Sequence, residues 1–562
     1  MCSSAGLYSF RSKALGSYRA SDDRGTFEAR AALPKGQSSI NPGFRVGSAL
    51  AFDYIAVLPG NQCSAKEPHM CGYIGIYGPD GTDVAGEIYE GLLAVQHRGQ
   101  DAAGIITFTE SFHVKKGLGL VLEIFNEKNM PRLRGNLGVG HVRYPTVGRG
   151  SKDDAQPFHL TFPVGVAMAH NGNVTNFQEL MDRHFKNSGT RLNSTCDLEV
   201  ILFAFVSALN ERIRAGHAVS AEDVFAAVKK VYKDVRGAYS VVAVLPDVGL
   251  VAFRDPYGIK PCVFGEKTTS EGRWYACASE SVVLDVNGYE RSFDLDAGEA
   301  VFVGHDRVVQ RRKLSDKPHR PCIFELVYFA RPDSFLDDMS VYKTRVRFGE
   351  ALAQQWLAEN RPTPDAIIPV PDSSRDAALA MAMELGIPYR EGLVKNRYIG
   401  RTFIMPSQLS RRNSIRRKLN PIPLEFEGKD VLLVDDSIVR GNTAARIVQM
   451  ARDAGAKKVY LASCSPPLIA PCPYGIDMAT KTEFVASNRT NDEIAHYLGV
   501  DGLIYLDREA MNTAARVGNP KIEKFCNACF TGDYPTGDIT LERLTAIEGE
   551  RLSARDEVGC RT

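Results

Sequence analysis

The feature that most constrains the fold is a regular alternation of short apolar runs and helical patterns between residues 366 and 463. Strand-like runs at 366–371, 431–436 and 458–463, mostly apolar, are separated by helical stretches at 375–385 and 442–454. Parallel strands cannot be joined by a tight turn, so a helix carries the chain back between them. The alternation therefore predicts a doubly wound parallel sheet of the α/β class.

The part of the chain before this region has a different pattern. A buried-strand pattern begins at Cys71, and strand-like runs follow at 137–142, 164–169, 239–245 and 249–254. Helical stretches at 84–98 and 196–233 lie between them, which favours a layered α/β sheet domain. Because 562 residues are too many for one hydrophobic core, we predict domains at 71–310 and 320–490, followed by a helical tail at 491–562.

Residues 1–70 are rich in Ser, Gly, Ala and Arg and show no sustained period. Acidic residues within them make a signal or transit peptide a poor interpretation. We expect this segment to be an extension or pro-segment that is removed, or the result of a misassigned start. The net charge of +1 gives no electrostatic reason to expect nucleic acid as a partner, and no apolar run is long enough for a membrane helix.

Cys71 directly follows Met70. If the working chain starts at Met70 and loses it, or if the extension is cleaved, Cys71 carries a free α-amine with a pKa of about 8. That amine can act as general base for the thiol of the same residue. A cysteine in an apolar strand is more often a buried hydrophobic residue, so the residue alone leaves both interpretations open.

Four further motifs accompany Cys71-Gly72, in the order and spacing of a known domain. With these motifs the stretch 71–310 resembles the glutaminase domain of N-terminal-nucleophile amidotransferases, and the resemblance implies an αββα sandwich. The motifs are Gln96-His97-Arg98-Gly99-Gln100, Gly140-His141-Val142-Arg143-Tyr144, Ala169-His170-Asn171-Gly172 and Thr195-Cys196-Asp197.

This resemblance implies a role for each matched residue. Cys71 would be the nucleophile, and Asn171 with the backbone N–H of Gly172 would form the oxyanion hole. A planar guanidinium is suited to clamp the α-carboxylate of glutamine, and an acid is suited to pair with its ammonium. The glutamine-binding residues implied in this way are Arg143, Thr146, Asp197 and Gly99.

A second site is indicated where the run Val431–Val434 ends in two acids, a polar turn and a helix. The turn's N–H groups and the helix N-terminus form an anion site, and the acids can hold ribose hydroxyls directly or through Mg²⁺. An acidic strand end also occurs in response regulators. The continuation resembles the binding motif of type I phosphoribosyltransferases for phosphoribosyl pyrophosphate (PRPP): Asp435, Asp436, Ser437, Ile438, Val439, Arg440, Gly441, Asn442 and Thr443.

The same resemblance implies further contacts to PRPP. Asp435 and Asp436 would contact ribose or magnesium, and residues 437–443 would hold the 5′-phosphate. Ser373 lies in a stretch similar to the pyrophosphate loop and would be another magnesium contact. Lys395 and Arg401 lie in a stretch like the mobile loop that closes on PRPP. The basic run 411–418 can also be read as a solvated or nucleic-acid-binding face.

Cys526 and Cys529 have a spacing that suits a metal or cluster better than a structural disulfide. Cysteines dispersed along a chain are usually core residues, and four thiolates at a metal site would suit zinc as well as an iron–sulfur cluster. The residues themselves therefore leave both the site and the metal open.

Both halves together, with the segment 328–334 between them, resemble the amidophosphoribosyltransferase family over about 71–535, and the four cysteines match its iron–sulfur branch. The resemblance implies formation of 5-phosphoribosylamine, glutamate and pyrophosphate from glutamine, PRPP and water, the first step of purine synthesis. It also implies Mg²⁺, a [4Fe-4S] cluster on Cys322, Cys472, Cys526 and Cys529, inhibition by purine nucleotides, a homotetramer and a reducing, cytoplasmic location. The alternative is a catalytically silent regulator that senses PRPP or purines.

Overall fold

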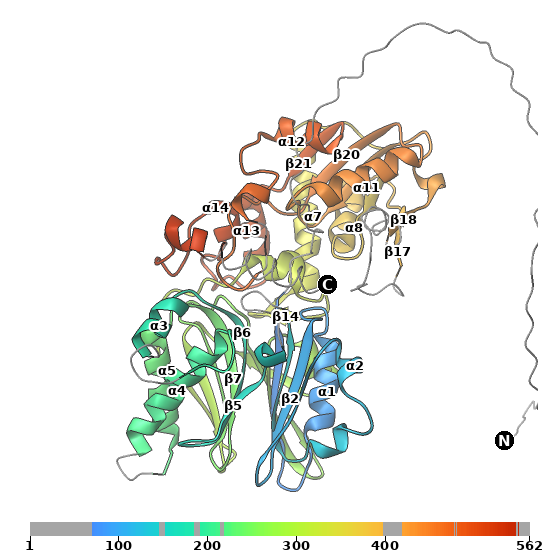
Figure 1. Ribbon diagram of the computed structural model, residues 1–562. Coiled ribbons are helices and arrows are strands. Elements are labelled where there is room, and N and C mark those ends of the chain that lie inside the picture. Colours follow the sequence, from blue (N-terminus) through green and yellow to red (C-terminus); the bar gives the residue numbers. More distant parts are fainter. Residues whose placement is uncertain are drawn as a thin grey trace, which may run out of the picture. The chain divides into compact units, whose positions relative to one another are not determined.

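The computed structural model describes residues 70–144, 152–184, 191–213, 218–396, 419–476, 478, 480–546 and 549 (Figure 1). All of them belong to one compact unit, Cys63–Thr562. Thr146, Arg401, the basic run 411–418 and the predicted extension up to residue 69 lie outside the described residues. Within the described parts of the chain, no helix is long and apolar enough to cross a membrane.

The first half contains two antiparallel sheets. The seven-stranded sheet has the order β11-β9-β10-β1-β4-β2-β3, and the six-stranded sheet has the order β13-β12-β8-β7-β6-β5. The strands of the first sheet are β1 (Gly72–Tyr77), β2 (Ala102–Phe108), β3 (Phe112–Leu118), β4 (Leu137–Arg143), β9 (Val263–Thr269), β10 (Gly272–Ala278) and β11 (Glu290–Asp294). Those of the second are β5 (Phe158–Leu160), β6 (Val166–Val174), β7 (Gly237–Leu245), β8 (Gly249–Arg254), β12 (Glu299–Gly304) and β13 (Val309–Lys313).

Helices cover the outer face of each sheet. Figure 1 shows α1 beside one sheet and α4 and α5 beside the other. The first set is α1 (Ala85–Ala94), α2 (Val121–Ile124) and α6 (Val282–Val286), with the 3₁₀ turn η1 (Met130–Arg132). The second set is α3 (Phe177–His184), α4 (Leu198–Ile213) and α5 (Ala221–Asp234), with η2 (Lys152–Asp154).

Alternation of side chains along each strand explains these layers. In β1, Ile74 and Ile76 pack into the core under α1, whereas Tyr73 and Tyr77 pack into a separate core between the two sheets. A third core lies between the six-stranded sheet and α3, α4 and α5. The result is four layers, helix–sheet–sheet–helix, which confirms the predicted αββα sandwich.

The helical stretch predicted at 196–233 contains two helices, α4 and α5. The second begins at Ser220, whose hydroxyl accepts the N–H of Asp223 while the Asp223 carboxylate accepts the N–H of Ser220. This reciprocal cap satisfies two N–H groups that have no partner within the helix and starts a new one.

The second half is built on a parallel sheet with the order β16-β19-β20-β21. Its strands are β16 (Ala366–Pro369), β19 (Asp430–Asp435), β20 (Lys458–Ser463) and β21 (Gly502–Tyr505). The parallel registers confirm the predicted doubly wound sheet. The helices are α7 (Val341–Ala358), α8 (Arg375–Leu385), α11 (Asn442–Asp453), α12 (Asn491–Leu498), α13 (Arg508–Arg516) and α14 (Ala528–Thr531).

Short elements join these parts. A π-helix, η3 (Glu325–Phe329), begins the passage from the first half to the second, and 3₁₀ turns lie at η4 (Pro423–Glu425) and η5 (Lys481–Glu483). Two small ribbons pair β14 (Phe335–Leu336) with β15 (Met339–Ser340) and β17 (Leu393–Lys395) with β18 (Leu419–Pro421).

The strand β21 lies within 491–562, where the sequence predicted a helical tail. It extends the parallel sheet, with Leu461 of β20 opposite Leu503. Its four residues, Gly-Leu-Ile-Tyr, form too short an apolar run to be distinguished from a buried helical segment by periodicity. The helical prediction is therefore incomplete at this point.

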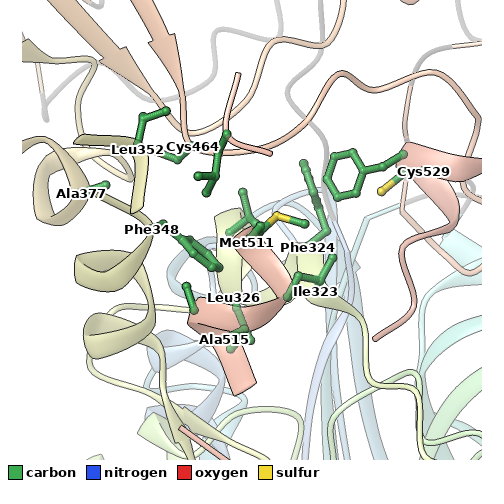
Figure 2. Packing of buried hydrophobic residues seen from close by; sticks show 14 of the residues in the cluster. Ile323, Phe324, Leu326, Phe348, Leu352, Ala377, Cys464, Met511, Ala515 and Cys529 are labelled. Carbon is green, nitrogen blue, oxygen red and sulfur yellow. The ribbon is translucent and has the colours of Figure 1, made fainter. Parts of the chain in front are cut away.

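One core connects the sheet of the second half with the chain's later segments. Figure 2 shows Phe348 and Leu352 of α7 together with Met511 and Ala515 of α13 and with Phe324 at the start of the passage between the halves. Cys322, Cys472, Cys526 and Cys529 belong to the same buried cluster. The segment that carries Cys526 and Cys529 is therefore packed into this core.

Candidate active sites

Cys71 lies directly before β1 and is buried. Its Sγ lies 3.7 Å from the carbonyl oxygen of Tyr144. Burial raises the pKa of the Cys71 thiol, and the nearby charge of Arg143 opposes this rise without cancelling it. The thiol therefore needs a base close to it in order to react as a thiolate at neutral pH.

The buried strand β6 carries the two residues predicted for the oxyanion hole. The Asn171 side chain is fully buried, and among the residues that the structure describes neither its amide nitrogen nor its oxygen has a hydrogen-bond partner. Gly172 has φ +152°, and a Cβ there would lie 2.1 Å from the carbonyl oxygen of Ala238. An unused buried amide beside an obligatory glycine is a donor pair available to a ligand.

Arg143 and Asp197 bring opposite charges to this region. Arg143 ends β4, and its guanidinium lies 3.8 Å from Asp154. Burial opposes ionisation of Asp197, but His170 at 3.4 Å and the N–H of Val174 at 2.8 Å outweigh it and lower the pKa of the carboxyl. A buried guanidinium and an ionised carboxylate suit the two charged ends of an α-amino acid.

Sequence reasoning missed the residues that hold these groups. Asp154 accepts both the backbone N–H and the hydroxyl of Thr195 at 2.9 Å, in addition to its ion pair with Arg143. Gln156 bonds to the ring and to the backbone N–H of His170 at 2.9 Å. His170 and Thr195 stand within recognised motifs, but Asp154 and Gln156 have no local signal because their partners are distant in sequence.

The predicted pocket residue Gly99 packs closely against β4. A Cβ there would lie 2.6 Å from the backbone carbon of Val142, so a larger residue does not fit. The preceding residue, Arg98, is fully buried between Glu280 at 2.7 Å and Glu325 at 2.8 Å. Because Glu325 begins the π-helix η3, this ion network joins the pocket to the passage between the halves.

The second predicted site lies at the carboxyl edge of the parallel sheet. Strand β19 ends at Asp435, and Asp436 accepts a hydrogen bond from Ser437 Oγ at 2.6 Å. Ser373, which follows the neighbouring strand β16, donates its hydroxyl to the other carboxylate oxygen of Asp436. The structure thus brings Ser373 and the acidic pair together, as an oxygen-rich group suited to Mg²⁺.

The turn after the acidic pair leads into α11. Gly441 has φ +77° and precedes the helix, so its position favours glycine. Ile438 is buried in the core, which leaves only its backbone for a ligand. Arg440 pairs with Glu483 at 3.1 Å, and Asn442 accepts the hydroxyl of Tyr497 at 3.0 Å. The N-terminus of the twelve-residue helix therefore offers backbone N–H groups to an anion.

Lys395 ends strand β17, and its ammonium lies 3.1 Å from the carboxylate of Asp372. Asp372 precedes Ser373, so this cation lies near the predicted pyrophosphate loop. Arg401, predicted for the same function, lies outside the described residues.

The four predicted cluster cysteines line one small buried cavity. Cys322 and Cys526 form a parallel bridge of backbone, and the N–H of Ala470 bonds to the carbonyl of Cys529 at 3.1 Å. The buried side chain of Lys260 lines the same cavity. Among the described residues, no three His, Cys, Asp or Glu side chains converge in the way that a single metal ion requires.

Two family models match the chain. Residues 141–285 match the glutamine amidotransferase domain, and residues 344–464 match the phosphoribosyl transferase domain. The first match covers β6 and the Asp197 turn, and the second covers β16, β19 and the acidic pair.

Curated proteins match along most of the chain. The amidophosphoribosyltransferase of Haemophilus influenzae is 48% identical over 489 residues, which are 86% of this chain and 96% of that protein. The amidophosphoribosyltransferase of Escherichia coli is 48% identical over 503 residues, 87% of this chain and 98% of that one.

A solved structure is also similar. It is a glutamine PRPP amidotransferase from B. subtilis complexed with ADP and GMP, with 35% identity and a TM-score of 0.73. The match covers 84% of this chain and 100% of that chain.

Proposed function

Because the chain belongs to the amidophosphoribosyltransferase family, we propose that its reaction is divided between the two sites described above. The enzyme converts glutamine, PRPP and water to 5-phosphoribosylamine, glutamate and pyrophosphate, and so begins purine synthesis. Glutamine is cleaved at Cys71, and the ammonia released displaces pyrophosphate beside Asp435 and Asp436.

The Cys71 thiolate attacks the carboxamide carbon of glutamine while Arg143 and Asp197 hold the α-carboxylate and ammonium. Asn171 and the N–H of Gly172 stabilise the negative oxygen of the tetrahedral intermediate. Ammonia then leaves, and water hydrolyses the thioester to glutamate. The observation that carries this proposal is the Asn171 amide, which is buried and has no hydrogen-bond partner in the described part of the chain.

The base for the thiol is the α-amine of Cys71 itself, once Cys71 is the first residue. Met70 is buried in the described chain, and its N–H bonds to the carbonyl oxygen of Arg98 at 3.2 Å. Removal of the residues before Cys71 would place the new amine in this buried environment beside the thiol. Thr146 would add a further contact to the glutamine carboxylate.

In the second half, the N-terminus of α11 and the turn 437–443 bind the 5′-phosphate of PRPP. Asp435, Asp436 and Ser373 would contact ribose and hold Mg²⁺, which would supply charge stabilisation to the departing pyrophosphate. Lys395 and Arg401 neutralise the same leaving group. The oxygen atoms that Asp436 and Ser373 bring together support this assignment.

Cys322, Cys472, Cys526 and Cys529 would hold a [4Fe-4S] cluster, which places the enzyme in the iron–sulfur branch of its family. The four cysteines line one shared cavity, which supports a common site for them. Four thiolates give such a cluster a net negative charge, and the buried Lys260 supplies a cation beside it. The cluster would be structural and would tie residues 526–529 to the core.

We also propose purine nucleotides as feedback inhibitors and a homotetramer as the assembly. The B. subtilis structure, complexed with ADP and GMP, supports the first of these. The silent-regulator alternative is not supported, because Cys71 and the acidic pair are intact and the curated relatives are named as enzymes.

The decisive experiment isolates the enzyme without oxygen and determines its first residue by intact mass and end sequencing. We expect Cys71 at the terminus, together with glutamine-dependent release of pyrophosphate from PRPP. Full glutamine-dependent activity in a form that keeps residues before Cys71 would contradict the role of the α-amine. Iron and sulfide analysis of the same sample tests the cluster, and zinc in their place would contradict it.

A further inference from the structure

A loop from the second half of the chain lies directly against the proposed oxyanion hole. A Cβ on Gly475 would lie 2.7 Å from the carbonyl carbon and oxygen of Gly172. Next to this contact, the amide of Asn173 donates a hydrogen bond to the carbonyl oxygen of Pro473 at 2.8 Å. The oxyanion strand β6 and the loop 472–476 are thus joined by backbone packing and by a buried hydrogen bond.

The loop also forms hydrogen bonds with residues late in the chain. The hydroxyl of Tyr474 lies 2.7 Å from Thr536 Oγ1 and accepts the N–H of Thr536 at 3.2 Å. The hydroxyl of Tyr534 donates to the carbonyl oxygen of Pro471 at 2.8 Å. These bonds give the loop a fixed conformation, so it can act as a rigid support.

The same late segment also holds the turn that follows β6. Arg543 donates to the carbonyl oxygen of Thr175 at 2.7 Å, and the Thr175 hydroxyl donates to Asp538 at 3.1 Å. The end of β6 therefore contacts two parts of the second half. The first half alone does not supply these contacts.

Oxyanion stabilisation depends on donors that are already in place before the substrate reacts. A displacement of about 1 Å can reduce a rate by roughly a hundredfold. Gly172 lies within β6, where pairing with β7 orients its backbone, and Gly475 packs against its carbonyl group, so a group added there would displace the backbone that carries the N–H. Gly475 packs there without space for a single added carbon.

We propose that the loop 472–476 positions the oxyanion hole, with Gly475 and Asn173 as its positioning residues. The inference rests on the proposed role of Asn171 and Gly172. Neither positioning residue touches glutamine; each acts by fixing the backbone that carries the donors. Cleavage of glutamine is therefore competent only while this loop from the second half is seated on β6.

The first test is Gly475→Ala, which places a methyl group against Gly172. Gly499→Ala is its matched control, because Gly499 also has a positive φ of 73° but no atom within 4 Å of an added Cβ. We expect Gly475→Ala to reduce kcat with glutamine roughly a hundredfold. KM for glutamine and activity with ammonium salts should change by no more than about twofold, and Gly499→Ala should leave the ratio of the two activities unchanged.

The second test is Asn173→Asp, which keeps the shape of the side chain and removes the donor to Pro473. Its matched control is Asn176→Asp, because Asn176 is a buried asparagine bonded within its own half, to Asp234 and Arg236 at 2.8 Å. We expect about a tenfold loss of glutamine-dependent kcat for Asn173→Asp alone, since one hydrogen bond near 1.4 kcal/mol is lost. This variant decides the question if Gly475→Ala does not fold.

Equal losses with glutamine and with ammonium salts in these variants would overturn the proposal, because they would indicate a purely structural contact. Unchanged glutamine activity in both variants would overturn it as well. Asn171→Ala serves as the reference. If that variant keeps full activity with glutamine, the proposed oxyanion hole is wrong, a failure that is distinct from failure of the positioning loop.

Discussion

The two proposed active sites are assembled in opposite ways. The proposed glutamine site collects residues that are far apart in sequence, with Cys71 beside β1, Arg143 at the end of β4 and Asn171 within β6, all buried in the sandwich. The proposed PRPP site takes most of its residues from the single stretch 435–443 at a sheet edge. The first site depends on hydrogen bonds and ion pairs between side chains, and the second depends on a backbone turn and a helix N-terminus.

This difference separates the effects of substitution. In the sandwich, a change behind the substrate contacts displaces them, because Asp154 and His170 anchor Arg143 and Asp197. At the sheet edge, a change has a large effect only when it alters a ligand atom. In the proposed division of the reaction, synthesis with ammonium salts uses the second site alone, so comparing the two nitrogen sources identifies which site a substitution has damaged.

The largest effect is expected for Cys71→Ala. Without the nucleophile, glutamine-dependent synthesis should fall by about 10⁴-fold or more. Synthesis with ammonium salts should stay within about twofold, because the PRPP site is untouched. Initial rates with each nitrogen source give the answer. Cys277→Ala, a buried cysteine of β10 in the same sandwich, is the control and should keep both activities.

Asp436→Asn should remove a ligand atom from the second site and reduce synthesis by about 10³-fold with either nitrogen source. Pyrophosphate release with glutamine and with ammonium salts measures this. Asp430→Asn, at the amino end of the same strand β19, is the control and should have little effect. A loss confined to glutamine would show that the two sites are not separated as described.

Glu280→Gln tests the buried ion network around Arg98. The charge of Arg98 and then that of His97 overcome the effect of burial and hold the pKa of Glu280 far below its usual 4.5. As the pH falls, the Glu280 carboxylate is therefore protonated in the unfolded chain before it is protonated in the folded one. The unfolding free energy should consequently fall as the pH drops below about 4.5. The variant should lose about 3 kcal/mol at pH 7 and show a flatter acid dependence in urea unfolding.

Asp154→Ala should produce the smallest of these effects. It removes the support of Arg143 and Thr195, so KM for glutamine should rise about tenfold while synthesis with ammonium salts is unchanged. Asp153→Ala, the exposed neighbour, is the control. If KM is unaffected in both variants, Arg143 binds glutamine without support from Asp154. The first site would then depend on its supporting side chains no more than the second does.

Strands and motifs that lie within one contiguous stretch of sequence could be predicted well. Residues 239–245, which form most of the buried strand β7, appear in the sequence as a strand-like run, and Asp435, Asp436 and the following turn form one contiguous motif. The parallel sheet was also predicted correctly from the sequence pattern, whereas the four-layer packing was implied by the family resemblance. Strand β21 was missed because four residues carry too little periodicity.

The supports of the glutamine site could not be predicted in this way. Asp154 meets Thr195, and Arg98 meets Glu325, across intervals that no spacing rule spans. The contact between Gly172 and Gly475 joins two glycines whose residue type alone indicates only a turn. Tertiary packing, not local preference, determines which distant polar groups become neighbours.

The contact between Gly172 and Gly475 also limits how such a protein can be recombined. A chimera that joins residues 71–310 to a different acceptor domain would lose the packing of Gly475 against the backbone of Gly172. The new domain would have to supply a loop that approaches this backbone equally closely. The first half can therefore fold as a module, but on the proposed role of Gly475 its glutamine cleavage depends on the second half. Exchange of domains between related proteins would have to retain both Gly172 and Gly475.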